Sequence, residues 1–388
     1  MKTECYIAKK YITERKRQSL ISVVGIALGV AVLTVSIAIA NGLNDNLITN
    51  ILSVTSHAFI GNYGRIEDYR ELAATIEQIP GVKGAVPAIE TQGIVKHTGP
   101  YGLYAAGVRI EGYDLGSAEK AMDLKKRIVE GEILPDKIDG ILLGRELQKI
   151  TGAKTGDTVT IISSENREID FTLTGIFQSG YYDYDVNMVI LPLTAAQYLM
   201  QSGDCTNRIN IMLKDPYKAP AIAAEVAEAT GKKVVTWGEV NRNLLQALSL
   251  EKTVMILVFS LIVVIAGFVV WVTLNNLVRE KIRDIGILRA MGYPRGSVTK
   301  IFLLQGLILG IAGIAAGLGV SWAVLSWLKH NSLSFVTSVY YLTRVPVVIS
   351  AREVLLIAAA NLVVILFSSV LPARRAGKLN TVEALRYE

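Results

Sequence analysis

Four apolar segments without a single charged residue place the strongest constraint on how this chain can fold. They are residues 19–40, 253–274, 301–328 and 354–371. An α-helix rises 1.5 Å per residue, so about 20 apolar residues cross a hydrocarbon core that is roughly 30 Å thick. One charge at the bilayer centre would cost roughly 2.5–3.5 kcal/mol, so the complete absence of charge predicts four transmembrane helices.

The spacing of these segments predicts one large domain inserted into a small membrane bundle. About 210 residues, 41–252, separate the first segment from the second, whereas the last three follow one another at short intervals. The loop 329–353 would lie on the same side of the membrane as the large domain. The expected fold class is a membrane protein with a four-helix transmembrane bundle and a large external domain.

The distribution of charge predicts the orientation. The N-terminal amphipathic segment 1–18 and the loop 275–300 each carry a net charge of +4, and the tail 372–388 carries +2. Loops rich in Lys and Arg stay in the cytoplasm. The loop 329–353 also carries +2, whereas residues 41–252 carry −6 in a chain whose net charge is +6. We therefore expect an integral inner-membrane protein with cytoplasmic termini and an extracytoplasmic domain. The basic surplus is an orientation signal, and no nucleic-acid partner is expected.

The first apolar segment has an alternative interpretation as a cleaved signal peptide, because a basic tail precedes it and Ala38-Ile39-Ala40 stands at its end. Signal peptides usually have an apolar region of about 7–15 residues. This segment is longer, and Leu43, Leu47 and Ile51 continue its helical period. We interpret it as an uncleaved span that continues as a helical stalk.

The external segment has the pattern of a mixed α/β domain. Apolar runs and alternations typical of strands, with one helical stretch, occur in residues 57–110, and the same texture returns at 207–237. Residues 111–203 begin with a charged, weakly patterned stretch and continue with short strands, with helices expected at 141–150 and 194–200. The pattern predicts a β-rich module of about 90 residues inserted into a strand–helix–strand domain.

Pairs of glycines four residues apart occur in two of the spans and predict close helix packing, within the subunit or across a dimer. The spans contain no Asp, Glu, Lys, Arg or His, so the sequence offers no proton relay and disfavours an ion-coupled transporter. The packing residues predicted are Gly25 and Gly29 in the first span and Gly306, Gly310, Gly313 and Gly317 in the third.

Catalytic and nucleotide-binding motifs are absent from the sequence. It contains no H-E-x-x-H motif, no Cys/His cluster, no G-x-S-x-G motif and no G-x-x-x-x-G-K-[ST] phosphate loop. We therefore expect a non-catalytic chain that holds no metal or cofactor. Any ATP and Mg²⁺ would be bound by a partner ATPase.

The loop 275–300 contains a short amphipathic helix, predicted over 279–291, that Gly292 and Pro294 would end. Apolar residues form one stripe, and basic residues cover much of the rest. Such a helix, projecting from a membrane bundle, suits a groove on an ATPase; a helix lying flat on the lipid headgroups is the alternative. The coupling residues predicted here are Ile282, Ile285, Leu288, Met291, Arg279, Arg283 and Arg289.

Two stretches carry a resemblance to a known family. Residues 279–292 (REKIRDIGILRAMG) resemble the coupling-helix signature of the FtsX/MacB-type (type VII) ABC transporter permeases, and 372–376 with 383–388 resemble the C-terminal ending of that superfamily. Three further stretches are similar to the LolC/LolE lipoprotein-releasing permeases. They are Asn41-Gly42 with the stalk that follows, residues 175–185, and residues 339–342 with Val345-Pro346.

The resemblance implies a fold and a set of partners. The external domain would be a porter-like α/β domain interrupted by a β-rich Sabre-like subdomain, which agrees with the inserted module. Two permeases, identical or related, would sit on an ABC ATPase dimer that transmits work outward. A lipoprotein would be extracted from the outer leaflet of the inner membrane, where the permease contacts membrane lipid, and passed to a soluble carrier. A MacB-like efflux permease with a separate ATPase and an FtsX-like regulator of cell-wall hydrolases are the alternatives.

The stretch 178–187 lies between two strand-like runs and combines a glycine with three tyrosines and two aspartates. We predict an exposed hairpin tip that contacts an external partner, because such a tip is polar enough for solvent and aromatic enough to bind. An ordinary hairpin whose tyrosines cover the β-rich module is the alternative. The contact candidates are Gln178, Tyr181, Tyr182, Tyr184 and Asn187.

Overall fold

The computed structural model describes residues 2–379 except 54, 62–63, 100–101, 123, 133–138 and 332–344. Contacts divide the described chain into two compact units. The membrane unit contains the residues up to Asp45 and those from Ala247 onward, and the external unit contains Asn46–Gln246. The resemblance at residues 339–342 and 383–388 lies outside the described residues.

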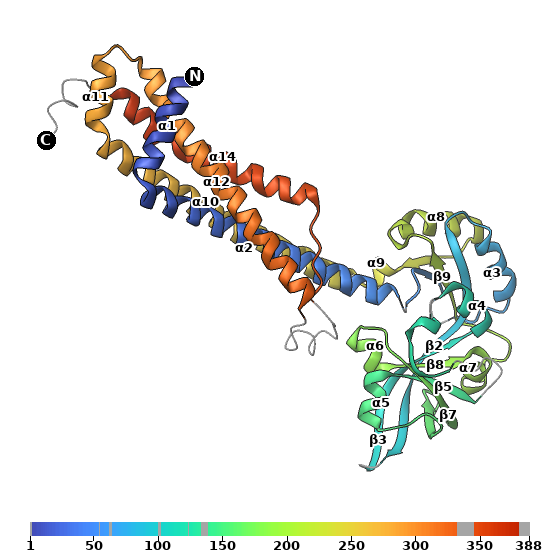
Figure 1. Ribbon diagram of the computed structural model, residues 1–388. Helices are drawn as coiled ribbons and strands as arrows, with labels where there is room; N and C mark the ends of the chain where they lie inside the picture. Colours follow the sequence, from blue (N-terminus) through green and yellow to red (C-terminus); the bar gives the residue numbers. More distant parts are fainter. Residues whose placement is uncertain are drawn as a thin grey trace. The chain divides into compact units, whose positions relative to one another are not determined.

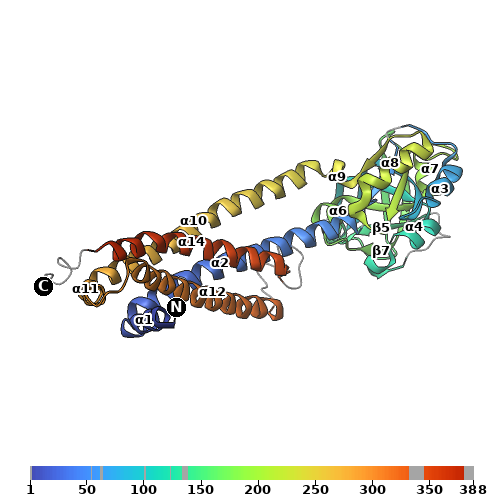
Figure 2. The same cartoon turned by 90° about the horizontal axis from the view of Figure 1, so that it is seen from above.

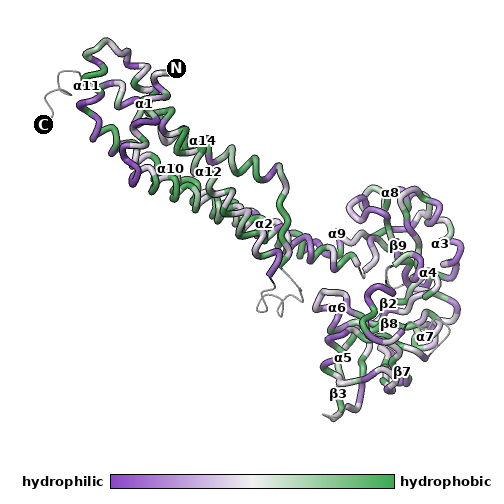
Figure 3. The backbone as a smooth tube through the Cα atoms, viewed as in Figure 1, coloured by the Kyte–Doolittle hydropathy of each residue, from purple (hydrophilic) through white to green (hydrophobic). Residues whose placement is uncertain are grey.

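The membrane unit is built on four long helices, all of them long and apolar enough to cross a bilayer (Figure 1). Each contains one of the four predicted spans, and their apolar character is visible along their length in Figure 3. The prediction of four membrane-spanning helices is confirmed. The helices are α2 (Lys16–Leu52), α10 (Arg242–Glu280), α12 (Arg295–His330) and α14 (Ala351–Lys378).

The described part of the membrane unit also contains two short helices. The N-terminal segment forms α1 (Lys2–Glu14), which packs across the first part of α12 (Figure 2). Ala8 and Tyr11 of α1 are buried there, and the Tyr11 ring centroid lies 6.3 Å from that of Phe302. The second is α11 (Ile282–Ala290), between α10 and α12.

The glycines of α12 let three helices approach closely, as predicted. A Cβ at Gly310 would lie 3.0 Å from Ile365 of α14, and one at Gly313 would lie 2.6 Å from Ile26 of α2. Gly306 faces Ser369 of α14 in the same way, and Gly317 faces the carbonyl of Ala27. Backbone proximity of this kind increases dispersion contact, which replaces the hydrophobic effect inside lipid.

The glycines of α2 do not have a comparably tight neighbour within the described chain. A Cβ at Gly25 would lie 3.5 Å from Val269, and one at Gly29 would lie 3.5 Å from Ile262, both on α10. These are ordinary van der Waals distances. A Cβ would therefore fit at both positions inside the subunit, and the packing role of this glycine pair, within the subunit or across a dimer, stays a prediction.

The external unit contains a ten-stranded sheet in the order β10-β1-β9-β2-β3-β8-β5-β7-β4, and β6 pairs with β2 and β7. Most pairs are antiparallel, but β3/β8 and β5/β7 are parallel. The strands are β1 (Ala58–Ile60), β2 (Val82–Gly99), β3 (Gly102–Tyr113), β4 (Ile128–Gly131), β5 (Gly140–Gly144), β6 (Thr158–Ser163), β7 (Glu168–Phe177), β8 (Met188–Pro192), β9 (Arg208–Leu213) and β10 (Val234–Thr236).

Short helices cover the sheet and connect its strands. They are α3 (Tyr69–Glu77), α4 (Leu115–Ala121), α5 (Arg145–Thr151), α6 (Tyr182–Asn187), α7 (Leu193–Leu199), α8 (Ala219–Thr230) and α9 (Trp237–Val240), with 3₁₀ turns at Leu124–Arg127 and Pro216–Lys218. The main buried core combines residues of α3, α7 and α8 with side chains from most of the strands.

The long β2–β3 hairpin joins the two parts of the external unit. Residues 82–88 of β2 pair with β9, whereas residues 93–96 pair with β6. The predicted inserted module, 111–203, supplies β4 to β8. Its predicted start at residue 111 falls inside β3, because the hairpin continues from one part of the sheet into the other without a break.

The helix predicted at 141–150 is partly wrong. Residues 140–144 form β5, all five of them buried between β7 and β8, and α5 begins at Arg145. An apolar run buried on both faces has no alternation, so periodicity alone does not distinguish it from a helix.

Candidate functional site

The predicted coupling helix is separated from α10 by a break at Lys281. Residues 279–280 belong to α10, and α11 spans Ile282–Ala290. The turn keeps its backbone hydrogen bonds, since the Lys281 N–H donates to Leu277 and the Lys281 carbonyl accepts from Ile285. Gly292 has a φ of +92°, a left-handed conformation that suits a glycine at the end of a helix.

The predicted apolar stripe of α11 does not all face outward. Ile285 is only 1% exposed, within a cluster formed by α1, α12 and α14, and Ile282 and Leu288 are half-buried. Met291 is 78% exposed and Ile287 is 46% exposed. The prediction that Ile285 contacts a partner is wrong, because this side chain fills the core of the chain's own bundle.

The outward surface of this end is both apolar and basic. Arg279 and Arg283 are exposed, as are Ile287 and Met291, whereas Arg289 is half-buried and donates to the Tyr293 carbonyl at 3.3 Å. Residues 283, 287 and 291 recur at four-residue intervals, so they share one side of the helical turn. We call these three residues, with Arg279, the coupling surface.

Lys281 anchors the break between the two helices. Its Nζ lies 2.7 Å from Glu14 of α1 and 3.0 Å from Asp284, and 4.9 Å from the centre of the Tyr11 ring. Burial acts to lower the pKa of Lys281, but the hydrogen bonds to Glu14 and Asp284 outweigh it and raise the pKa. The ammonium therefore stays charged and holds α11 against α1.

Further contacts tie α1 and the start of α2 to the helices around them. The Arg15 side chain lies 3.1 Å from Glu280, and Gln18 donates to the same carboxylate at 3.0 Å. At the other end of α1, Ser297 of α12 donates to Glu4 at 3.2 Å. Burial, with the charge of Asp284, raises the pKa of Tyr11 to about 12. These contacts hold α11, which carries part of the coupling surface, against α1 and the neighbouring helices.

Comparisons with known proteins agree with this architecture. Residues 19–229 match the model of the MacB-like periplasmic core domain, and residues 256–381 match that of the FtsX-like permease C-terminal domain. The chain belongs to the ABC transporter permeases of the FtsX/MacB type. Its spans and α/β external unit make it an integral membrane subunit with an extracytoplasmic domain.

Individual relatives align with this permease along almost its whole length. It is 29% identical to the lipoprotein-releasing system transmembrane protein LolC of Neisseria meningitidis serogroup B, over 99% of each chain. It is 27% identical to the transmembrane protein LolE of Haemophilus influenzae, again over 99% of each chain. Among solved structures, the periplasmic region of MacB from Actinobacillus actinomycetemcomitans matches 50% of this chain and 93% of its own, at 13% identity and a TM-score of 0.34.

The stretch 178–187 of the permease is not a hairpin tip. Residues 182–187 form α6, and β5 lies between β7 and β8 in the sheet, so the two flanking strands do not pair. The predicted hairpin is wrong because a strand from elsewhere in the chain inserts between them. Tyr182 and Asn187 are exposed, Tyr181 and Tyr184 are half-buried and stack edge to face at 5.0 Å, and Gln178 accepts from Arg145 at 2.6 Å.

A buried carboxylate fixes the turn that precedes α6. Asp185 is fully buried and accepts from the N–H groups of Ser179 at 2.6 Å and Gly180 at 3.3 Å. Burial raises the pKa of Asp185. The Gly180 carbonyl in turn accepts from Asn50, near the end of α2, at 3.1 Å. The first stalk therefore touches the segment that presents Tyr182 and Asn187.

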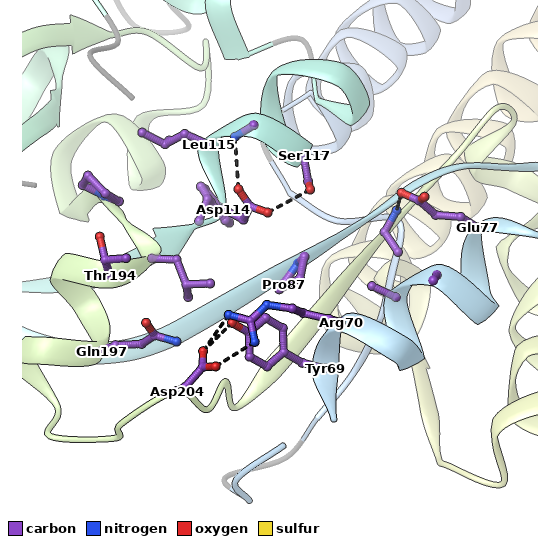
Figure 4. Close-up of a pocket in the computed structure, with 17 residues that line it drawn as sticks. Tyr69, Arg70, Glu77, Pro87, Asp114, Leu115, Ser117, Thr194, Gln197 and Asp204 are labelled. Atoms are coloured by element: carbon purple, nitrogen blue, oxygen red, sulfur yellow. Dashed lines mark hydrogen bonds and ion pairs between the residues drawn. The ribbon is translucent and has the colours of Figure 1, made fainter. Parts of the chain in front are cut away.

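Figure 4 shows a polar groove of the external unit that lies between α3, α4 and α7 and has a volume of about 620 Å³. Its charged groups are paired within the groove. Arg70 lies 2.7 Å from Asp204, and the Tyr69 hydroxyl donates to the same carboxylate at 2.7 Å. The hydrogen bonds from Arg70 and Tyr69 lower the pKa of Asp204 to about 2. In the described part of the chain, no cluster of His, Cys, Asp and Glu suits a metal.

Glu111 of β3 is the buried acid of a second, smaller cavity of about 150 Å³, which Arg109, Tyr184 and Arg208 also line. It is 5% exposed. Burial raises the pKa of Glu111 to about 7, against opposing effects of the Arg109 charge and a hydrogen bond from Tyr113. The carboxyl group is therefore protonated in the folded protein at mildly acidic pH.

This raised pKa predicts a pH-dependent stability. The folded state favours the protonated form of Glu111. Its contribution to the free energy of unfolding is therefore complete below pH 4.5 and is lost as pH rises through 7. A shift of this size corresponds to about 3 kcal/mol. Glu111→Gln should therefore stabilise the full chain at pH 8 but not at pH 4.5, as measured by thermal unfolding in detergent. Glu168→Gln, at an exposed carboxylate of β7, is the control; an unchanged difference between the two pH values in Glu111→Gln would contradict the prediction.

Proposed function

We propose that this chain is the permease subunit of a complex that extracts lipoproteins from the outer leaflet of the inner membrane and delivers them to a soluble carrier. The observation that carries the proposal is the full-length similarity to both LolC and LolE, which includes the bundle and the external unit together. A MacB-like efflux role and an FtsX-like regulatory role remain alternatives that no separate observation on this chain favours.

The architecture suits a protein that transmits mechanical work along its helices, and it does not require a solute path through the membrane bundle. The α2 helix continues from its span to Leu52, and α10 begins at Arg242, before its span. The polar side chains buried in the described spans, such as Gln305 and Asn361, lie between packed helices. An ATPase that moves the bundle would therefore move the stalks, and no solute needs to cross the bilayer.

The proposed partners follow from this role. An ABC ATPase dimer would bind the coupling surface from the cytoplasm, which places both termini of the permease there, and it would supply the ATP and Mg²⁺ sites. A second permease, identical or related, would complete the complex. The lipoprotein and the carrier would meet the external unit.

Reconstitution tests the function directly. The permease would be co-expressed with an ABC ATPase and, where one exists, a related permease of the same organism, purified, and incorporated into liposomes that contain a fluorescent acylated lipoprotein. ATP should release the lipoprotein to an added soluble carrier, whereas a non-hydrolysable ATP analogue should not. Hydrolysis of ATP without any lipoprotein release, in the presence of a carrier, would contradict the proposal.

Crosslinking tests whether α6 takes part in the transfer. A photoreactive amino acid at Tyr182 or Asn187 should form adducts with the carrier or the lipoprotein, because both positions are exposed. The matched control is Tyr198 on α7, which is 63% exposed. Adducts at Tyr198 but only intrachain products at Tyr182 and Asn187 would remove α6 from the contact surface.

A further inference from the structure

The end of the membrane unit away from α11 holds a set of contacts that the proposed function has not used. Asn41 of α2 donates from Nδ2 to Oε1 of Glu353 at 2.8 Å. The N–H of Val348 donates to the Ala38 carbonyl at 3.1 Å. Gly42 faces the carbonyl of Pro346 so closely that a Cβ would overlap it. Three contacts thus join one turn of α2 to the residues before α14 and to the first turn of α14.

Residues 345–350 form an extended strap across the helix ends. Val347 and Ile349 pack on a small apolar cluster that contains Ala38 of α2 and Leu325 of α12. The strap runs directly into α14, so a single short segment contacts three of the four long helices. It has little room to shift at Gly42, because the neighbouring atoms there are backbone atoms.

Glu353 has two structural tasks at the end of this strap. Its Oε2 accepts from the Ser350 N–H at 2.9 Å in a capping box that begins α14, and its Oε1 accepts from Asn41. Burial acts to raise the pKa of Glu353, but the hydrogen bonds from Ser350 and Asn41 outweigh it and lower the pKa. The carboxylate therefore remains charged, and charge-assisted hydrogen bonds are stronger than neutral ones.

The corresponding end of α10 lacks such hydrogen bonds to the strap among the described residues. Leu250, Val254, Ile256 and Leu257 are all more than half exposed. The two stalks therefore differ within one subunit: the strap holds the end of the α2 span, and no described segment holds the end of the α10 span in the same way.

We propose that residues 345–353 act as a clasp that makes the outer end of α2 and the start of α14 move as one body, with Asn41 and Glu353 as its positioning pair. This inference rests on the proposed transmission of work from the ATPase to the external unit. It assigns α2 as the driven stalk, because displacement of α12 and α14 reaches it through the clasp. The α10 stalk follows with greater freedom.

A pair of variants isolates the hydrogen bond. Asn41→Asp places a carboxylate against Glu353 and should open the clasp. In Asn41→Asp/Glu353→Gln, the new amide can donate to the carboxylate introduced at position 41 while its oxygen accepts from Ser350, so the clasp should close again with the bond reversed. Asn41→Ala removes the bond without adding charge, in case Asn41→Asp reduces expression. Thr253→Val, which removes the Thr253 hydroxyl bond to Ser249 on α10, is the matched control.

Two readouts on the assembled complex decide the proposal. Cys5 and Cys205 would be replaced by Ser, and spin labels placed at Asp45 and Arg352 would report the α2–α14 separation by pulsed electron paramagnetic resonance. A second pair, Glu251 and Arg352, would report α10. The ratio of lipoprotein released to ATP hydrolysed would be measured in the same complexes without labels.

In the wild type, the distribution of distances between labels at 45 and 352 should be narrow and unchanged by ATP, whereas the distribution of distances between labels at 251 and 352 should change. Asn41→Asp and Asn41→Ala should broaden the first distribution and lower the release ratio several-fold, with assembly retained, and Asn41→Asp/Glu353→Gln should restore both. Wild-type distances and release ratio in the single variants would overturn the clasp. A wild-type complex that releases no lipoprotein would instead overturn the proposed function, and the distance measurement would still decide the clasp.

Discussion

Met291→Asp should release the ATPase from a permease that remains folded. Met291 is 78% exposed at the end of α11, so a charge there costs the permease little. In a partner groove the same charge would be buried without a counter-ion, and loss of one hot-spot contact of about 2 kcal/mol weakens binding roughly 30-fold. The measurement is ATPase co-purification together with the thermal midpoint of the isolated permease.

The matched variants of this experiment separate docking from folding. Met291→Leu keeps an apolar side chain and should bind the ATPase normally. Ile285→Asp should instead unfold the basic end of the bundle, because Ile285 is 1% exposed and an unpaired buried charge is costly. Normal ATPase binding by both Met291→Asp and an Ile287→Asp variant would exclude this surface as the docking site.

Gly313→Leu/Gly317→Leu should disrupt the bundle itself. A Cβ at Gly313 would already lie 2.6 Å from Ile26, and one at Gly317 would lie 2.7 Å from the Ala27 carbonyl, so leucine side chains must push α2 away from α12. Overpacking costs about 1–3 kcal/mol per site, and backbone atoms cannot move aside as side chains can. We expect a strongly lowered thermal midpoint in detergent or loss of the folded protein.

Two control variants give this experiment its contrast. Gly319→Leu lies on the same helix, where nothing lies within 4 Å of the added Cβ, and it should leave the midpoint unchanged. Gly25→Leu/Gly29→Leu should also leave the isolated chain folded, since both glycines have ordinary distances to α10. If that variant folds but fails to assemble with a second permease, the two glycines lie at the subunit interface. An undisturbed Gly313→Leu/Gly317→Leu protein would contradict the packing described here.

Local patterns in the sequence predicted the helices and strands that depend only on residues close to one another in the chain. The spans follow from uncharged runs long enough to cross lipid, and the stalk follows from the helical period that continues to Leu52. The amphipathic helix after the second span was also predictable, with its end at Gly292. In the external unit, the strand-like and helical pattern of residues 207–237 correctly predicted the region of β9 and α8, because these elements are short and well bounded.

Long-range contacts decided what those patterns left open. The stretch 178–187 is a turn followed by α6, and not a hairpin, because β5 lies between β7 and β8, and no pattern within the stretch encodes that insertion. The sequence predicted that Ile285 faces a partner, because amphipathic spacing shows which apolar residues share one face of α11 but not what that face contacts. Tertiary packing gives that stripe partly to α1, α12 and α14 and leaves Ile287 and Met291 outside.

The sequence alone determined that this chain is a four-span membrane protein with one large external domain. The reason is that the free energy of transferring a segment from water to lipid depends on the apolar and charged residues of that segment itself. Only the tertiary structure decided which residues cooperate across the chain. Asn41 and Glu353 are 312 residues apart and belong to different helices, so their contact depends on how those helices pack.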